Sequence, residues 1–392
     1  MKQLLVVLFC LFSISILTAQ QRELSPEAEI SVLTVGPGPS LNDAFGHNGF
    51  RIQDPTFGID LVFNYGVYDF GAPNFYLKFA RGKLDYLIGL DYYQDFFTFY
   101  KGQNRSIKEQ VLNLSQGEKQ SLFDFLVENF KPENRRYLYD FFYDNCATRI
   151  RDVVEQNTEN TITFKTTEEF EAKTFRGLIY EHVSKNTWGS FGIDLALGSV
   201  IDKEATPYEH MFLPNYIHQF FENAEYENGQ SLVESSTTIF EPSNEEESGT
   251  FFLSPMFIIS VLSIIIIIIT YKNWIRGIRS KWLDFMLFTF TGLVGLILLL
   301  LWFATDHTAT AFNYNLLWAF PLNIIVLGQV TKQRVGQRFI KYLKFLLIIL
   351  VLIVSHWLIG VQVFAITLIP LLLAIAFRYV FLIRHYQNKL SS

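Results

Sequence analysis

The chain has 392 residues, a formal net charge of -6 and a hydrophobic content of 50%. A mildly acidic chain with no basic aromatic groove in its polar half does not fit a nucleic-acid-binding protein, so we expect no nucleic-acid partner. Residues 1–250 have the composition of a globular protein rich in Phe and Tyr, whereas residues 251–392 contain long apolar runs typical of membrane proteins.

Residues 1–20 have the pattern of a cleaved secretory signal peptide. Lys2 precedes an apolar run at 4–17 that is short for a membrane span and ends in small polar residues. Cys10 lies inside this run and follows a Phe, which argues against a lipid-attachment cysteine. The sequence therefore predicts an exported protein in which Cys146 is the one cysteine left.

Residues 22–225 are predicted to form an exported α+β domain. Alternating apolar residues predict a strand at 29–35, followed by a Gly-Pro turn. A second strand is expected to follow the loop at 41–47, and a third covers residues 60–66. We expect the second and third strands to pair across the turn at 54–58.

His47 is the candidate general base, at the start of the second predicted strand. Gly46 and Gly49 flank it and allow backbone or substrate to approach closely. In the expected pairing, Asn64 of the third strand reaches the imidazole. A histidine oriented by an asparagine suits a cysteine nucleophile, because the third group sets the tautomer and the ring direction. A lone histidine is more often structural, and that alternative stays open here.

Residues 73–105 mix a short helix with aromatic strands. This aromatic density suits either a packed core, which is the commoner case, or an acyl-chain groove near a bilayer. A strand is expected at 107–114. Ser115 then has the spacing of a capping box and predicts a helix that runs to about residue 130.

The stretch DNCATRIRDVVE, at 144–155, carries the candidate nucleophile. Helical spacing of the apolar residues after Cys146, with Asp144 or Asn145 as N-cap, places the sulfur at a helix N-terminus. Unpaired N–H groups and the helix dipole there favour a thiolate. A free cysteine is more often buried and inert, but these neighbours are too polar for a core segment. We expect Asn145 and Arg149 to contact substrate.

Residues 226–250 are acidic and rich in Ser, which is typical of a linker. Residues 251–385 are predicted to form an all-α bundle of five transmembrane helices, because five apolar segments are long enough to span a bilayer. These segments cover 252–270, 284–304, 313–330, 343–360 and 362–383.

Lys and Arg are unevenly distributed over the loops between these segments. They gather in the loops 271–283 and 331–344, whereas 305–312 and 359–363 carry none. By the positive-inside rule the basic loops are cytoplasmic and the exported domain is periplasmic, which agrees with an odd number of spans.

The external loop at 305–312 carries Asp306 and His307, which we expect to take part in substrate binding. Polar residues at the rim of a bundle are either ordinary interfacial residues or part of a site shared with the exported domain, and both interpretations stay open. In the second case, the pair would lie beneath the cleft and help to deprotonate an incoming amine.

Several motifs together resemble one family. AFGHNGFRI, VFNYGVYDF, PNFYLKFARGKLDY, PENRRYLYDFFYDNCATR and TDHTAT are similar to the DUF4105 family of Bacteroidota, which contains Lnb-type lipoprotein N-acyltransferases. The resemblance covers nearly the whole chain after the signal peptide. It implies a permuted papain-like or NlpC/P60-like thiol fold, in which the histidine precedes the cysteine. Where that arrangement has a second polar residue on the next strand, this chain has Asn64.

The function implied by this resemblance is lipoprotein N-acylation in the bacterial inner membrane. His47 would activate Cys146, and an acyl chain would pass from a membrane phospholipid through a Cys146 thioester to the N-terminal amine of a diacylglyceryl-cysteine lipoprotein. This route requires no cofactor and no metal. A membrane-anchored periplasmic cysteine peptidase or amidase would use the same two residues, and a non-enzymatic envelope module would have a merely buried cysteine. The sequence leaves both alternatives open.

Overall fold

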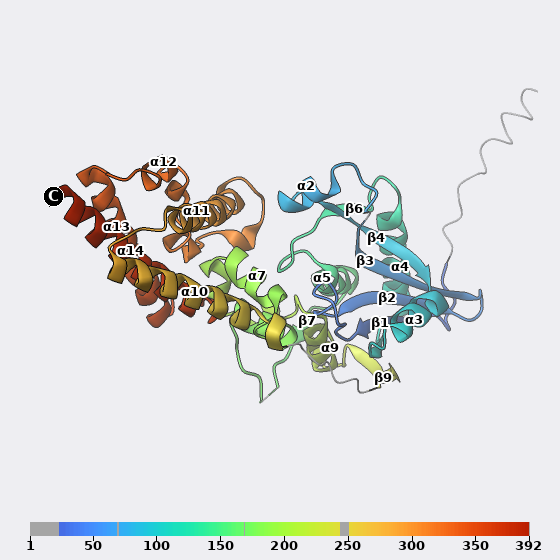
Figure 1. Ribbon diagram of the computed structural model, residues 1–392. Coiled ribbons are helices and arrows are strands. Elements are labelled where there is room, and N and C mark those ends of the chain that lie inside the picture. The colour runs from blue at the N-terminus through green and yellow to red at the C-terminus, as the bar shows by residue number, and fades with distance from the viewer. Residues whose placement is uncertain (1–22, 69, 168, 244–250, 392) are drawn as a thin grey trace, which may run out of the picture.

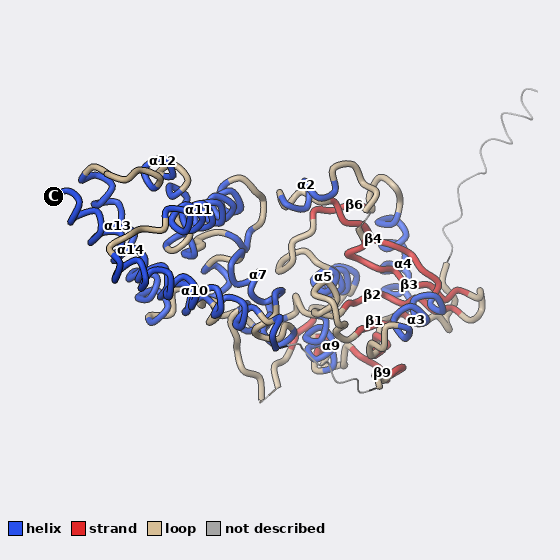
Figure 2. Tube along the Cα trace, in the orientation of Figure 1, coloured by secondary structure: helices blue, strands red, loops and turns tan. Residues whose placement is uncertain are grey.

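The computed structural model describes residues 23–68, 70–167, 169–243 and 251–391 (Figure 1). The signal peptide expected at 1–20 lies outside the described residues. The chain forms an N-terminal domain of mixed sheet and helix, up to residue 243, and a helical region from residue 251 onward (Figure 2).

In the described part of the N-terminal domain, seven strands form one antiparallel sheet, in the order β6-β4-β3-β2-β1-β5-β9. The strands are β1 (Glu29–Val35), β2 (His47–Asp54), β3 (Ile59–Val67), β4 (Asp85–Tyr92), β5 (Ile107–Leu112), β6 (Arg136–Leu138) and β9 (Val233–Phe240). The expected pairing of β2 with β3 is confirmed, and Gly49 lies opposite Asn64. A small second sheet pairs β7 (Ile162–Phe164) with β8 (Ala224–Tyr226).

Apolar residues of β1 alternate between the two faces of the sheet, so each face has its own core. Ile30 and Val32 belong to the main core, which is completed by the buried faces of several helices. Leu33 and Val35 belong to a smaller cluster with Phe96 of α3 on the opposite face. The helices of this domain are α2 (Phe75–Ala80), α3 (Tyr93–Gly102), α4 (Gln116–Phe130), α5 (Cys146–Asn157), α6 (Phe175–His182), α7 (Trp188–Ala196), α8 (Pro207–His210) and α9 (Pro214–Glu222).

The prediction of a linker at 226–250 is wrong over much of that range. Strand β9 pairs with β5 as the edge of the large sheet, so the N-terminal domain extends to residue 243. An edge strand can be polar, because its backbone completes the open hydrogen bonds of its neighbour while its side chains face water. Residues 244–250 lie outside the described residues.

Among the described residues, four helices are long and apolar enough to cross a membrane: α10 (Pro255–Arg276), α11 (Lys281–Phe303), α13 (Gln337–Leu358) and α14 (Leu368–Ser391). The prediction of a fifth continuous helix, at 313–330, is wrong. That segment is broken into short turns, η5 (Tyr314–Leu317), η6 (Pro321–Asn323) and α12 (Leu327–Val330).

The broken segment lies in a groove on α11. A Cβ at Gly295 would lie 2.0 Å from the carbonyl oxygen of Ala319, so only glycine permits this approach. Asn323 donates to the Thr291 hydroxyl at 2.8 Å and accepts from Tyr342 at 2.6 Å. Such contacts within the protein are what non-helical backbone needs at membrane depth.

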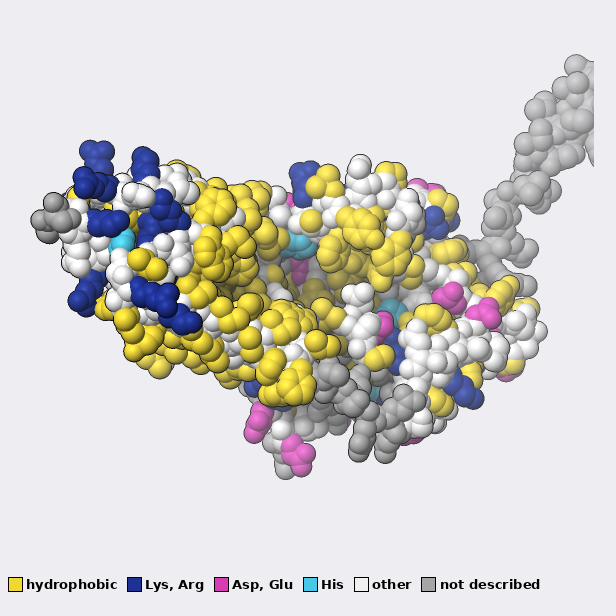
Figure 3. Space-filling view, in the orientation of Figure 1, with side chains coloured by type: hydrophobic (Ala, Val, Ile, Leu, Met, Phe, Trp, Pro, Cys, Tyr) yellow, Lys and Arg dark blue, Asp and Glu magenta, His cyan; other side chains and the backbone are white. Residues whose placement is uncertain are grey.

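The segment at 313–330 runs the length of the helical region. Phe312, just before it, accepts a hydrogen bond from Ser199 of the N-terminal domain, and Val330, at its other end, accepts one from Arg279 in the loop between α10 and α11. Lys and Arg side chains gather at that far end, beyond a band of hydrophobic surface (Figure 3). Five membrane crossings therefore remain the prediction, with one crossing irregular.

The two parts of the chain contact each other directly, with α7 between them (Figure 1). Gly198 donates its N–H to the carbonyl of Ala309 at 2.9 Å, and Asn313 donates its amide to the carbonyl of Leu195 at 2.7 Å. A Cβ at Gly198 would lie 1.8 Å from the carbonyl oxygen of Ala311. The external loop of the helical region is therefore held against the N-terminal domain.

Candidate active site

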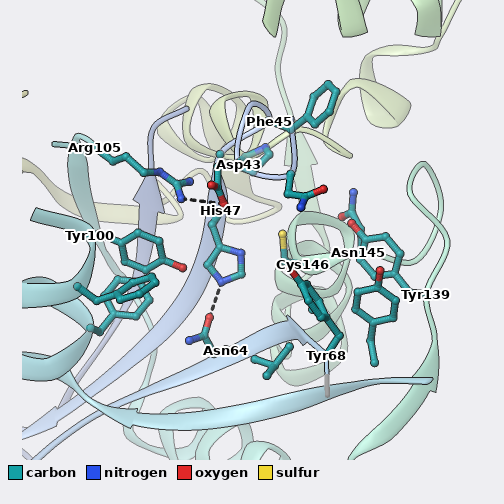
Figure 4. Close-up of a pocket in the computed structure, with 18 of the residues that line it drawn as sticks. Asp43, Phe45, His47, Asn64, Tyr68, Tyr100, Arg105, Tyr139, Asn145 and Cys146 are labelled. Carbon is teal, nitrogen blue, oxygen red and sulfur yellow. Dashed lines mark hydrogen bonds and ion pairs between the residues drawn. The ribbon is translucent and has the colours of Figure 1, made fainter. Parts of the chain in front are cut away.

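A cleft of about 690 Å³ opens where β2 begins and α5 begins (Figure 4). This volume lies within the range of about 300–1,000 Å³ found for small-ligand sites. Cys146, His47 and Asn64 all line it. The structure therefore brings together the three residues that the sequence selected as a catalytic group.

Cys146 is the first residue of α5, as expected, and Asn145 is the N-cap. The Asn145 amide oxygen accepts from the N–H groups of Ala147 and Thr148, and its nitrogen donates to the carbonyls of Phe141 and Phe212. These four bonds use the hydrogen-bonding capacity of the amide. We therefore assign Asn145 to positioning the helix. Because Asn145 also lines the cleft, the substrate contact expected from the sequence stays a prediction.

His47 enters the cleft because Gly46 turns the chain immediately before it. Gly46 has a φ of +82°, and a Cβ there would lie 2.6 Å from the carbonyl oxygen of Val35. The His47 ring is held between two partners: Nε2 bonds the side-chain oxygen of Asn64, and the other edge of the ring faces the sulfur of Cys146, with which it forms a side-chain hydrogen bond (Figure 4). Because Asn64 presents an oxygen, Nε2 carries a proton.

Asp91 extends this arrangement by one residue. The Asn64 amide nitrogen donates to the Asp91 carboxylate at 2.8 Å, which orients the amide oxygen toward His47. The sequence analysis missed Asp91. The signal available was its polarity within an otherwise aromatic stretch, but the sequence does not reveal that β4 pairs with β3 in the register that brings Asp91 to Asn64.

The pKa values of the sulfur and the imidazole move toward a charged pair. Burial alone raises the pKa of Cys146, but His47 and the N–H groups of Asn48 and Ala147 outweigh burial and hold this pKa below its usual value. Burial alone lowers the pKa of His47, but Cys146 and Asn64 outweigh it and raise this pKa. Both shifts favour a thiolate beside an imidazolium, which is the state required of a cysteine nucleophile.

Two family models match the chain. Residues 18–180 match the Lnb N-terminal periplasmic domain, and residues 245–389 match the Lnb transmembrane domain. The chain belongs to the Lnb family. It is therefore a multi-pass membrane protein with a periplasmic domain, which is the N-terminal domain described above. Comparisons with curated proteins and with solved structures find no match.

The Lnb transmembrane model is named for five helices. In the described part of this Lnb chain, four long helices and the broken segment at 313–330 occupy the matched region. The permuted papain-like fold, in contrast, stays an expectation, since it comes from the resemblance of motifs alone.

Arg149 does not have the place in this Lnb site that the sequence predicted. Its guanidinium donates to the Asp144 carboxylate at 2.7 Å and lies 4.5 Å from the centre of the Tyr137 ring. It is not among the residues that line the cleft. The expectation of substrate contact is wrong because the ion pair with Asp144 and the contact with the Tyr137 ring hold the guanidinium outside the cleft.

Tyrosines form part of the wall around the Cys146–His47 pair in this Lnb site. The Tyr100 ring stacks on the imidazole at 6.0 Å between ring centres. Burial raises the pKa values of Tyr100 and Tyr139, so both hydroxyls stay protonated. The sequence analysis had assigned such aromatic residues mainly to a packed core, and the cleft shows that some of them contact the space beside the sulfur.

Asp306 and His307 lie against the periplasmic domain of this Lnb chain, outside the cleft. Asp306 pairs with Lys83 at 3.3 Å, and its N–H donates to the carbonyl of Arg81. The ring of His307 bonds the carbonyl of Phe79 at 3.0 Å. The loop therefore adjoins the N-terminal domain, which was one of the two interpretations left open, and its role toward an incoming amine stays a prediction.

The charged pair predicts an unusual pH dependence of alkylation. Because the pKa of Cys146 is lowered, its rate of reaction with iodoacetamide is expected to stay high below about pH 8.5, the ordinary pKa of a thiol. In His47→Ala, burial is no longer opposed by a neighbouring imidazolium, so the rate profile should move to higher pH. Superimposable rate profiles of the two proteins would show that His47 does not set the state of the sulfur.

Proposed function

We propose that the chain is a lipoprotein N-acyltransferase of the bacterial inner membrane. The observation that supports this most directly is the Cys146–His47–Asn64 group, in a cleft beside the external loop of the membrane region. A covalent acyl-enzyme is the natural product of a thiolate and an adjacent imidazolium. Both substrates, a phospholipid and a lipoprotein, are anchored in the same membrane leaflet, so a membrane-bound enzyme meets them at high effective concentration.

The first half-reaction loads the acyl chain on the enzyme. The Cys146 thiolate attacks the ester carbonyl carbon of a phospholipid and forms the carbon–sulfur bond. The carbon–oxygen ester bond then breaks, and the His47 imidazolium gives its proton to the departing oxygen of the lysophospholipid. A thioester and a neutral His47 remain.

The second half-reaction transfers the chain to the lipoprotein. The neutral α-amine of the diacylglyceryl-cysteine attacks the thioester carbonyl and forms the carbon–nitrogen bond. His47 takes the proton that the nitrogen releases, and the carbon–sulfur bond breaks, with Cys146 leaving as thiolate. The charged pair is restored and the product is an amide.

The start of α5 supplies the stabilisation for both tetrahedral intermediates. The N–H of Cys146 lies in the first turn of the helix, where backbone donors lack partners in the helical ladder. The dipole of the helix adds partial positive charge at the same end. We assign the oxyanion to this N–H, since such donors act most strongly when they are fixed in advance.

The test is mass spectrometry of lipoprotein N-termini. Cells with the gene should contain triacylated lipoproteins, and cells without it should contain the diacylated form. With the purified full chain, phospholipid and a diacylated lipopeptide should give an N-acylated lipopeptide and lysophospholipid. Cleavage of the lipopeptide backbone, with no acyl transfer, would instead identify a peptidase.

Asn64→Ala is expected to lower the rate of acyl transfer by roughly 10- to 100-fold, because the imidazole loses the group that orients it. The alkylation profile of Cys146 should also shift toward higher pH, since Asn64 helps to raise the pKa of His47. A merely structural role would not move this profile. Asn228→Ala, at an exposed turn, is the matched control.

A further inference from the structure

A second cavity, of about 380 Å³, lies between the external loop of the helical region and the N-terminal domain. Residues 306–310 form one side of it, and α2, α6 and α7 contribute to the other. In the space-filling view, a hollow separates the hydrophobic surface of the helical region from that of the N-terminal domain (Figure 3). The cavity therefore lies at the end of α11, where the external loop begins.

This cavity adjoins the cleft that holds Cys146. The two share five lining residues, which are Asn42, Phe45, Tyr86, Tyr139 and Phe141. Phe45 and Tyr139 lie on the side of the sulfur away from Asn64 (Figure 4). A group held in the second cavity is thus separated from the cleft of Cys146 only by side chains that line both spaces.

Most of the cavity wall is apolar. Leu84, Ile193 and Leu197 line it together with Ala309 from the external loop. The carboxylates at its rim are already paired: Asp140 accepts from the hydroxyl of Thr308 at 2.7 Å, and Asp306 pairs with Lys83. A hydrocarbon chain would find a matching wall there.

The surface beside the cavity has the composition of a membrane contact. On α2, Tyr76 is 80% exposed and Leu77 58%, and Phe79, which also lines the cavity, is 55% exposed. Adjacent large apolar side chains exposed in this way mark a site of association. Lys78 and Arg81 of the same segment suit the phosphates of lipid headgroups.

We propose that this cavity binds the acyl chain that Cys146 removes from the phospholipid donor. The acyl chain enters from the membrane beside α2 and occupies the cavity lined by residues 306–310. Its ester carbonyl is then presented to the sulfur of Cys146. The inference rests on the proposed function and adds to it the site that selects the donor by the length of its acyl chain.

The test measures acylation of Cys146 in the full chain in nonionic detergent, with phosphatidylethanolamines from octanoyl to stearoyl as donors. Ala309→Trp fills the cavity from the loop side, and Leu41→Trp fills it from a residue that is 44% exposed, where folding tolerates bulk. Both should slow acylation by palmitoyl donors about tenfold or more relative to octanoyl donors, as expected for steric exclusion from a hydrophobic pocket. Ala304→Trp, outside the cavity, is the matched control.

A soluble ester, p-nitrophenyl acetate, separates the possible failures. The variants should react with it at the rate of the unchanged chain, because acetyl needs no cavity. If the acylation rate depends on donor chain length in the same way in all proteins, the cavity does not bind the acyl chain. That result would leave the proposed acyltransferase function unaffected. Equal loss of acetylation and palmitoylation would also count against the cavity. If the protein without substitutions is acetylated by p-nitrophenyl acetate but accepts no acyl group from phospholipid, the proposed function is refuted.

Discussion

Cys146→Ser is expected to reduce N-acylation of lipoproteins by roughly 10⁴-fold or more, because a serine hydroxyl beside His47 is a far weaker nucleophile than the thiolate. His47→Ala should lower the rate of N-acylation by a similar factor. The thiol and the imidazole act as one unit, so the loss of either one disables both. The measurement is mass spectrometry of a reporter lipoprotein from cells that carry each variant.

The control for this prediction is His356→Ala, a histidine in α13 that does not line the cleft. All variants should be present in the membrane in equal amount, because the substituted side chains contribute little to the core. Full N-acylation by Cys146→Ser would exclude a thioester on Cys146 as the required intermediate.

Arg176→Ala is expected to lower the free energy of unfolding by about 3–5 kcal/mol, the usual cost of removing one partner of a buried ion pair. Arg176 is only 1% exposed and pairs with Asp194 at 3.0 Å and Asp202 at 2.7 Å. Its removal leaves two carboxylates with little access to water. Thermal unfolding of the full chain in detergent should show a midpoint lower by roughly 6–20 °C, given the size of the domain.

Arg136→Ala, at an exposed position of β6, is the matched control and should change stability by no more than about 0.5 kcal/mol. The Arg176 cluster lies beside the contact with the external loop, because Arg176 also donates to the carbonyl of Gly198, whose N–H bonds Ala309. A midpoint unchanged in Arg176→Ala would show that the two carboxylates find other partners or take up protons.

Local patterns in the sequence were sufficient to predict the centre of the candidate site. His47 and Asn64 come together because a short turn joins two strands of period two, and such hairpins determine their own register. Cys146 begins a helix because a capping residue precedes an apolar stripe of helical period. These interactions lie within one hairpin or one helix, so neighbouring residues suffice to predict them.

The approach of Cys146 to His47, by contrast, depends on how α5 packs on the sheet. The sequence indicated it through the residue types, a lone cysteine and a histidine flanked by glycines, and through the resemblance to a family. The same holds for Asp91, whose contact with Asn64 requires the pairing of β3 with β4. Arg149 lies outside the cleft because Asp144 and the Tyr137 ring hold its guanidinium, and the helical period does not reveal such contacts.

By itself, the sequence determined the division into an exported part and a membrane part, the hairpin of His47 and the helix of Cys146, because composition and short-range periodicity carry that information. Only the tertiary structure decided that β9 closes the sheet, that residues 313–330 form a broken segment against the glycines of α11, and that a second cavity adjoins the cleft. Each of these depends on contacts between separate elements of the chain, which no local pattern encodes.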